Sequence, residues 1–228
     1  MPEINHKSVT AILLLLMVVA LFTGSGLTPQ AASDDVVMEY YLENVASVFS
    51  RDYLFETEKS FACQVRSIYR RTDYRGELNS IDTALFGLYG HHGKIDSITI
   101  VDSAAVGNNR FPGKLGLVRV WEAENSYYFF PNDTGAGRLA IGYEPVDSEA
   151  ENPPSGFFNI DRYNFDLLAL FVYFPDPPDN ERLSRTFSFD RVDSVIVPRK
   201  LEIHATKMRF LGREYINHIL EFFDYHIN

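Results

Sequence analysis

The sequence predicts a mainly β domain: a strongly curved antiparallel sheet of about eleven strands with a helix at its N-terminal end. Two observations carry this prediction. The chain of 228 residues contains 18 Phe and 13 Tyr, and aromatic residues favour strands. From Phe61 onward, apolar and polar residues alternate in runs separated by short, turn-rich connections, and this is the pattern of an antiparallel meander.

Residues 1–33 have the composition of a secretory signal peptide. An unbroken apolar run covers Ala11–Phe22, a positive charge precedes it, and small residues follow it up to Ala31-Ala32-Ser33. We therefore expect cleavage before Asp34 and a periplasmic or secreted protein. The alternative is an uncleaved inner-membrane anchor, since residues 9–27 reach the ~20 residues that a membrane span needs.

Residues 34–228 are expected to form a single domain. Loss of the signal segment removes Lys7 and Glu3, so the net charge stays at −10. A surface of this charge repels phosphate backbones, and a nucleic-acid partner is not expected. No basic run is dense enough to hold an anionic membrane surface, so membrane contacts are expected to be at most transient. We also expect a monomer.

Cys63 is the only cysteine, so an intramolecular disulfide is excluded. The domain must therefore be held together by its core. Cys63 lies in an alternating run and not at the signal-peptide exit. We expect it to be a small buried side chain on a strand; the alternative, a reactive nucleophile, is disfavoured.

The first element of the domain is expected to be an amphipathic helix of about four turns. Asp34 and Asp35 suit the positive end of its dipole, while Glu39, Glu43 and Asn44 mark its polar side. Its apolar side contains Val37, Met38, Tyr41, Leu42, Val45, Val48 and Phe49. Because the polar side is acidic, this helix is expected to pack on the core and not on a membrane.

The strands follow in order from Phe61. They are expected at Phe61–Arg66, Ile81–Tyr89, Ile95–Val101, Leu117–Trp121, Tyr127–Phe130, Arg138–Glu144, Phe157–Ile160, Phe165–Phe174, Ser184–Phe189, Ser194–Thr206 and Tyr215–Tyr225. Phe165–Phe174 also fits a buried helix, but its strand-forming residues favour a strand. Pro198 cannot donate to a ladder, which predicts a sheet edge or a bulge there. Gly90–Gly93 is expected to be a hairpin loop, and Asp147–Pro154 an exposed loop.

Two histidine pairs are candidate metal ligands. His91 and His92 are adjacent, and adjacent residues on a strand point to opposite faces, so they are poor chelators. His204 and His218 lie on the two arms of the last hairpin and face each other in one register.

A second register of this hairpin separates those histidines and places Leu201 opposite Phe222 and Ile203 opposite Leu220. We favour it because it gives the more apolar face, although it sets Glu202 against Glu221. No metal is therefore expected.

The remaining motifs carry little chemistry. The acidic residues of Asp147–Glu151 lack the spacing of a calcium loop, and Asn132-Asp133-Thr134 matches only a glycosylation acceptor pattern. No nucleophile elbow, glycine-rich phosphate loop or paired-cysteine motif is present. We expect no cofactor and no enzymatic activity. Convergence of His204, His218 and a carboxylate would revive the hydrolase or metal-enzyme alternative.

Aromatic residues are concentrated in one part of the chain. They are Trp121, Tyr127, Tyr128, Phe129, Phe130, Tyr143, Phe157 and Phe158. Tyr127–Phe130 is aromatic on both faces of its strand, so one face meets the core and the other is covered, exposed or part of an apolar groove. We take Trp121, Phe130 and Tyr143 as candidate ligand-binding residues.

Three stretches near the C-terminal end carry a family resemblance. Ser155–Asp161 has a glycine, a strand and an Ile-Asp pair, and Asp193–Ile203 has a strand ending in proline, a basic residue and an alternating strand. Phe222–Asn228 has a final strand with an Asp-Tyr-x-x-Asn ending. In these stretches the chain resembles the lipoprotein-carrier superfamily of the bacterial envelope. The resemblance implies an eleven-stranded half-barrel whose concave face holds acyl chains and is partly closed by helices.

Together these features predict an extracytoplasmic, non-enzymatic protein. It would bind a lipid, an acylated protein or another apolar ligand in the concave face of its sheet, in lipid or lipoprotein transport. No cysteine for lipid attachment follows the signal segment, which disfavours a membrane-tethered acceptor. The alternative is an envelope interaction module with a filled core, which would bind a partner protein through a sheet edge or an aromatic patch.

Overall fold

A computed structural model describes residues 34–103, 111, 115–123, 126–133, 135, 137–147, 153–175, 177, 180–210 and 212–228. The predicted signal segment, residues 1–33, lies outside this part. The chain divides into two compact units, Met1–Val37 and Met38–Asn228, and the sheet and its core belong to the second. Within the described residues, no helix is long and apolar enough to cross a membrane.

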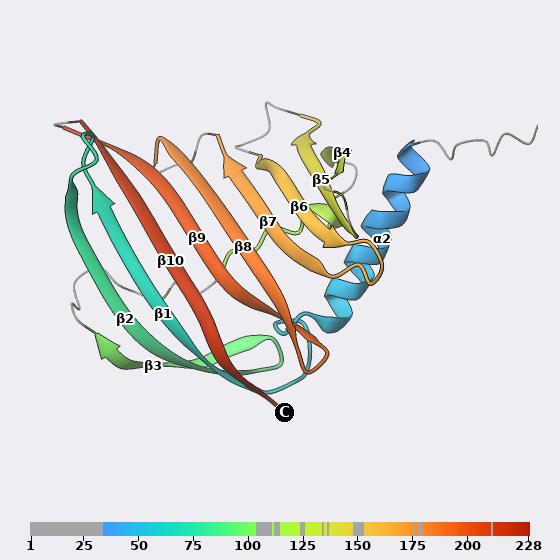
Figure 1. Cartoon of the computed structure of the whole chain (residues 1–228), viewed down its shortest axis with the longest axis horizontal. Coiled ribbons are helices and arrows are strands. Elements are labelled where there is room, and N and C mark those ends of the chain that lie inside the picture. The colour runs from blue at the N-terminus through green and yellow to red at the C-terminus, as the bar shows by residue number, and fades with distance from the viewer. Residues whose placement is uncertain are drawn as a thin grey trace, which may run out of the picture. The chain divides into compact units, whose positions relative to one another are not determined.

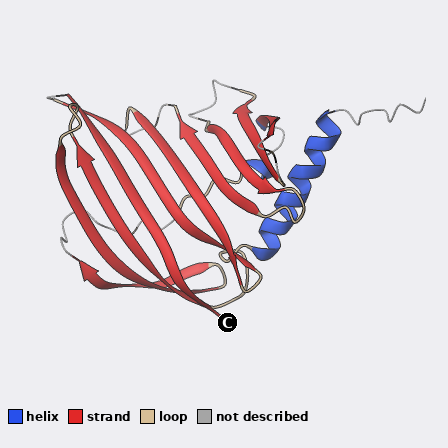
Figure 2. Cartoon of the chain, in the orientation of Figure 1, coloured by secondary structure: helices blue, strands red, loops and turns tan. Residues whose placement is uncertain are grey.

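The second unit is built on one unclosed sheet (Figures 1 and 2). Helix α2 spans Asp34–Asp52, and η1, a single 3-10 turn, spans Val120–Glu122. The strands are β1 (Phe61–Thr72), β2 (Leu78–His91), β3 (Lys94–Ser103), β4 (Tyr127–Asp133), β5 (Arg138–Pro145), β6 (Ser155–Asp161), β7 (Leu167–Phe174), β8 (Arg182–Val192), β9 (Val195–Arg209) and β10 (Gly212–Ile227).

The strand order is β3-β2-β1-β10-β9-β8-β7-β6-β5-β4, and every neighbouring pair is antiparallel. The chain therefore starts in the middle of the sheet, runs outward to β3, crosses to the opposite edge at β4 and returns to β1. This confirms the mainly β fold with an N-terminal helix and a curved antiparallel sheet (Figure 1).

The described residues contain ten strands and not eleven, because the strand predicted at Leu117–Trp121 does not form. This segment has no ladder partner and ends in η1. There Val120 and Trp121 are fully buried. The apolar residues that suggested a strand therefore pack in the core without forming one. The ambiguous segment Phe165–Phe174 is a strand, as predicted, and begins at Leu167.

The sheet has two different faces. The inner face is the one on which α2, from Met38 onward, and η1 pack. Phe49 of α2 lies 6.0 Å from Phe189 of β8 and 5.2 Å from Trp121 of η1, measured between ring centroids. The opposite side of the sheet is the outer face. Along each strand the residues alternate between the two faces, and the large buried side chains belong to the inner one.

Two hairpins close through two-residue turns. His92 and Gly93 have φ values of 47° and 72°, and Asp193 and Ser194 have φ values of 47° and 67°. Positive φ at both central residues matches the twist of the flanking strands. The loop predicted at Gly90–Gly93 is thus tighter than expected, since β2 continues through His91.

Pro198 lies at a bulge, as predicted. The β8–β9 ladder passes from Ser188 opposite Lys200 to Phe189 opposite Pro198, so one residue of β9 is skipped. The ladder between β9 and β10 ends at Lys200 and Glu221, before it reaches the proline. Pro198 therefore faces no strand donor on the β10 side.

The favoured register of the last hairpin was wrong by two residues. Leu201 lies opposite Leu220 and not Phe222, and Ile203 lies opposite His218. The observed register keeps the apolar face and places Glu221 opposite Lys200, which avoids the like-charge pair with Glu202. The tight turn that pairs Arg209 with Gly212 fixes this alignment.

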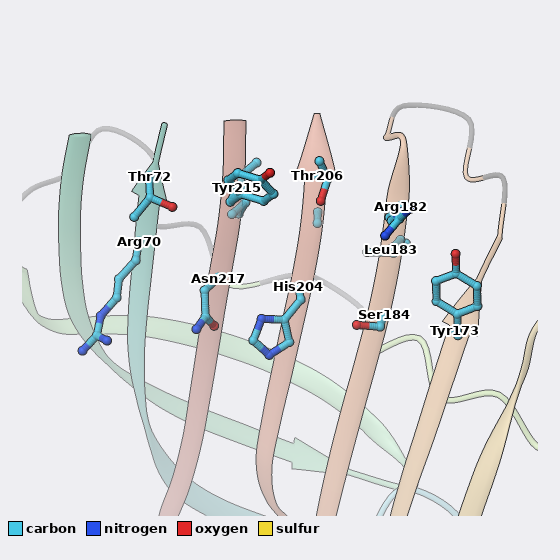
Figure 3. Close-up of a pocket in the computed structure, with 12 residues that line it drawn as sticks. Arg70, Thr72, Tyr173, Arg182, Leu183, Ser184, His204, Thr206, Tyr215 and Asn217 are labelled. Carbon is cyan, nitrogen blue, oxygen red and sulfur yellow. The ribbon is translucent and has the colours of Figure 1, made fainter. Parts of the chain in front are cut away.

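The two histidines of this hairpin lie on opposite faces. His204 is opposite Asn217 on the outer face, where Figure 3 shows the two side chains on neighbouring strands. His218 is on the inner face, where its Nε2 lies 2.8 Å from the hydroxyl of Ser67. Burial lowers the pKa of His218. The convergence that would have supported a metal enzyme is therefore not formed.

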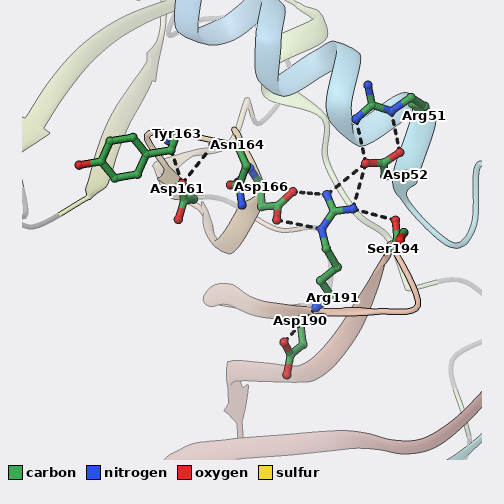
Figure 4. A network of polar contacts seen from close by, with 9 residues as sticks. All are labelled: Arg51, Asp52, Asp161, Tyr163, Asn164, Asp166, Asp190, Arg191 and Ser194. Atoms are coloured by element: carbon green, nitrogen blue, oxygen red, sulfur yellow. Dashed lines mark hydrogen bonds and ion pairs between the residues drawn. The ribbon is translucent and has the colours of Figure 1, made fainter.

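A polar network holds the end of α2 against the sheet (Figure 4). The Arg191 guanidinium donates through Nε to Asp166 at 2.9 Å, through Nη2 to Asp52 at 3.1 Å, and through Nη1 to the Ser194 carbonyl at 2.7 Å. Hydrogen bonds from Arg51 and then from Arg191 lower the pKa of the Asp52 carboxyl. The network fixes the position at which the chain leaves the helix.

Candidate functional site

A pocket of about 490 Å³ opens on the inner-face side of the sheet. Three separate segments form it: the chain that follows α2, the turn between β2 and β3, and the strand-free segment before η1. Its described lining residues are Tyr53, Phe55, Glu56, Gly93, Lys94, Ile95, Leu115, Gly116, Leu117 and Arg119. We call this the inner pocket.

The first wall of the inner pocket is fixed by backbone pairing. Where β10 has separated from β9, the chain after α2 takes its place: Tyr53 forms a parallel bridge with Ile196, and the Leu54 amide donates to the Ile196 carbonyl at 2.9 Å. Gly93 lets the β2–β3 turn approach this chain. A Cβ at Gly93 would lie 2.1 Å from the Phe55 carbonyl oxygen, so no larger residue fits there.

The apolar part of the pocket is continuous with the core. Tyr53 is 3% exposed and stacks on Phe49, which in turn contacts Trp121. Phe55 contacts Phe61 of β1 with ring centroids 5.2 Å apart. Burial raises the pKa of the Tyr53 phenol, so this side chain is neutral. The wall is therefore a rigid aromatic surface.

The rim of the pocket is charged. Arg119 pairs with Glu56 across the opening and with Glu122 at 3.1 Å. Lys94 lines the opposite side, on the first residue of β3. The pocket thus combines apolar lining residues with a rim of mixed charge, on which Lys94 and Arg119 lie beside the Glu56 carboxylate.

The size and lining of this pocket suit the binding of a small molecule. Its volume falls within the range of about 300–1,000 Å³ that is typical of small-molecule sites, and such sites are mostly apolar with a few polar groups. None of its described lining residues is a serine, cysteine or histidine. Among the described residues, no group of three or more potential metal ligands occurs.

The three sequence-predicted ligand residues do not line one surface. Trp121 and Tyr143 are fully buried and contact Phe158, with centroids 5.6 and 6.4 Å away. Phe130 is 44% exposed on the outer face, because Phe130 pairs with Gly142 while Phe129 pairs with Tyr143. The structure therefore brings Trp121 and Tyr143 together in the core and separates Phe130 from them.

Contact between a ligand and these three residues stays a prediction. Trp121 could influence the inner pocket only through the residues that it packs against. Trp121 supports Phe49, which supports the pocket wall at Tyr53. Sequence reasoning missed Phe55, Ile95 and Leu117, because the pocket is made where three segments distant in sequence meet. The apolar residues of Leu117–Trp121 were a signal, but they were interpreted as a strand.

Other sequence candidates have local partners. His91 pairs with Asp96 on the neighbouring hairpin arm, and its ring contacts that of His92. Of the candidate calcium residues Asp147–Glu151, only Asp147 lies within the described residues, and Thr134 of the acceptor pattern lies outside them. Cys63 is 5% exposed, which confirms a buried strand position, and burial raises the pKa of its thiol to about 12.

The chain is similar in structure to several solved proteins. A domain from Vibrio parahaemolyticus that is described as an outer-membrane lipoprotein-sorting protein is 13% identical, with a TM-score of 0.41, over 82% of this chain and 92% of that chain. The MucA/MucB complex of Pseudomonas aeruginosa gives 9% identity and a TM-score of 0.29, over 81% of this chain and 93% of that chain. A second structure of MucB with the MucA periplasmic part gives 9% and 0.27, over 81% and 92%. No protein-family model and no curated protein matches the chain.

Proposed function

We propose that the protein is an extracytoplasmic, non-enzymatic binding protein that takes an apolar chain into the inner pocket. The ligand class is a lipid or the acyl chain of an acylated protein, and the role is transport or shielding of that chain. The observation that carries this proposal is the inner pocket itself, an apolar cavity of about 490 Å³ with a charged rim.

Burial supplies the binding energy in this account. Each methylene moved from water into the pocket contributes about 0.8 kcal/mol without directional chemistry. Lys94 at the mouth suits a ligand whose polar end is a carboxylate or phosphate, whereas Arg119 is already paired with Glu56 and Glu122. The N-terminal segment, with its signal-peptide composition, supports a location outside the cytoplasm, where lipids and acylated proteins are the apolar chains to be carried.

The test is uptake of a fluorescent fatty acid by the purified protein. Leu117 is half-buried and lines the pocket, so Leu117→Asp places a carboxylate where the chain would lie. We expect at least about a tenfold loss of affinity, since an unpaired charge disfavours apolar contact by more than 1.4 kcal/mol.

The matched control is Phe130→Asp, which introduces the same charge at an exposed apolar residue of the outer face. It should leave uptake unchanged. Equal uptake by the wild type and Leu117→Asp, with both folded, would rule out the inner pocket. Loss of uptake in Phe130→Asp alone would move the apolar site to the outer face.

A second candidate function is an interaction module that pairs through β3. This strand forms one edge of the sheet and pairs only with β2 within the described residues. Ile98, Ile100 and Val101 are 41%, 62% and 59% exposed on it. Exposed apolar edge strands are templates for strand addition. Ile100→Lys should then abolish cross-linking to a partner protein and leave fatty-acid uptake intact, whereas Leu117→Asp should do the reverse.

A further inference from the structure

A second hollow, of about 460 Å³, lies on the outer face, on the side of the sheet opposite to the inner pocket. The register of five neighbouring strands builds it. One cross-strand row consists of Thr72, Tyr215, Thr206 and Arg182, each directly opposite the next. We call this hollow the outer groove.

The adjacent row crosses one strand more. It consists of Arg70, Asn217, His204, Ser184 and Tyr173, again in direct opposition. Figure 3 shows the side chains of both rows along the ends of these strands. Every position in the two rows is polar or a tyrosine, although the same face carries Ile68, Ile219 and Phe171 in the next row.

The outer groove is cationic in a chain whose net charge is −10. Arg70 and Arg182 have no ion-pair partner among the described residues, and no carboxylate belongs to the described lining. Two described acidic residues close to this lining in sequence already have partners. Glu181 accepts from Arg213 at 2.7 Å, and Glu202 pairs with Lys200.

His204 also has an acidic neighbour, since its Nε2 lies 3.5 Å from the Glu202 carboxylate. The two arginines therefore give the outer groove its positive charge, although the neighbouring Glu181 carboxylate also interacts with Arg182.

Asn217 contributes a polar side chain to the lining of the outer groove. Its side-chain oxygen is buried and has no partner within the protein. A buried acceptor without a donor costs free energy, and such groups are rare in native structures. Asn217 lies between Arg70 and His204 in its row.

We propose that the outer groove binds an acidic oligosaccharide. Arg70 and Arg182 lie on strands three steps apart, about 14 Å across the sheet, so they suit two carboxylates spaced along one ligand better than a single phosphate. Tyr215 and Tyr173 provide ring surfaces for the apolar faces of sugar rings. The hydroxyls of Thr72, Thr206 and Ser184 and the Asn217 amide match the hydroxyl groups of sugars, which both donate and accept.

The test is isothermal titration calorimetry of the full chain with trigalacturonate. Maltotriose, which has the rings without the charges, and triglutamate, which has the charges without the rings, are the comparison ligands. We expect one trigalacturonate per chain and binding at least about tenfold weaker for either comparison ligand.

Four variants test whether trigalacturonate binds in the outer groove. Arg70→Gln, Arg182→Gln and Asn217→Leu should each weaken trigalacturonate binding by about tenfold or more. Arg66→Gln is the matched control, since Arg66 lies on the same strand and face but pairs with Glu221 outside the groove. Fatty-acid uptake should be retained by all four, which separates this proposal from the inner pocket.

Three results would overturn the proposal. They are the absence of saturable trigalacturonate binding, equal binding of triglutamate, and a loss in Arg66→Gln as large as in Arg70→Gln. The second result would define a general polyanion surface and not a saccharide site.

Discussion

Tyr53 stacks on Phe49, with ring centroids 4.2 Å apart and an angle of 22° between the planes. Phe49 is in the last turns of α2 and is fully buried, whereas Tyr53 lines the inner pocket. The pair therefore joins the core of the domain to the wall of the pocket. Because the helix places Phe49, the packing of α2 also sets the shape of the site.

Tyr53→Ala should damage both stability and the pocket. Removing a buried aromatic side chain lowers the free energy of unfolding by about 3–5 kcal/mol, because a cavity is left behind. Tyr53→Phe keeps the ring and should be close to neutral. Urea unfolding of the two variants checks this, and equal destabilisation would mean that the hydroxyl and not the ring is the important group.

Arg191→Gln should release the end of α2. The side chains of Asp52 and Asp166 are only 14% and 11% exposed, so loss of their common partner should lower stability by about 1–3 kcal/mol at pH 7. Arg199→Gln, which breaks an exposed pair with Asp190 near the same hairpin, should cost less than about 1 kcal/mol.

The Arg191 effect should depend on pH in a defined direction. The pKa of Asp52 is lowered below 3.8 in the folded protein, so its contribution is complete above that value and is lost as the pH falls through the folded pKa. The difference between wild type and Arg191→Gln should therefore shrink at pH 3. A difference that grows on acidification would contradict the network.

His218 should lower the stability of the fold at a higher pH than the Asp52 carboxyl does. Its folded pKa lies below 6.5 because it is buried, so the unfolded chain binds the proton first as the pH falls. The free energy of unfolding should then decrease progressively below pH 6.5. His218→Gln should flatten this part of the profile, and a wild-type profile that is flat between pH 7 and pH 5 would contradict a buried neutral imidazole.

Cys63 should be unreactive in the folded protein. Its thiol has a pKa of about 12 and is 5% exposed, and only the thiolate attacks an alkylating reagent. Iodoacetamide at pH 8 should label it slowly in buffer and rapidly in urea. A Cys63→Ser, Ser60→Cys double variant moves the thiol to an exposed position and should react in both conditions.

Much of the fold could be predicted, because burial patterns repeat along the chain. The alternation at Phe61–Arg66 and the strand formers of β7 were sufficient for strand prediction, and Pro198 marked its own bulge. The strand prediction at Leu117–Trp121 failed because apolar, strand-forming residues indicate burial and not the presence of a ladder partner.

The sites were harder to predict, because they depend on alignment between distant segments. The inner pocket forms where Tyr53, Gly93 and Leu117 come together in space. The periodicity of apolar residues along the sequence does not predict such a contact between distant segments. The outer groove needs the β9–β10 register, and that register was misassigned by two residues because Leu220 and Phe222 are both apolar. With the observed register, His204 and Asn217 share a row, and the polar surface becomes visible.

The most direct test of the account is native mass spectrometry of the chain expressed in a bacterial periplasm and purified without detergent, followed by lipid extraction. A protein that carries an apolar chain in the inner pocket should retain close to one lipid per chain, and Leu117→Asp should lose it. A ligand-free mass, together with no uptake of a fluorescent fatty acid by the wild type, would contradict the binding function and favour the interaction through β3.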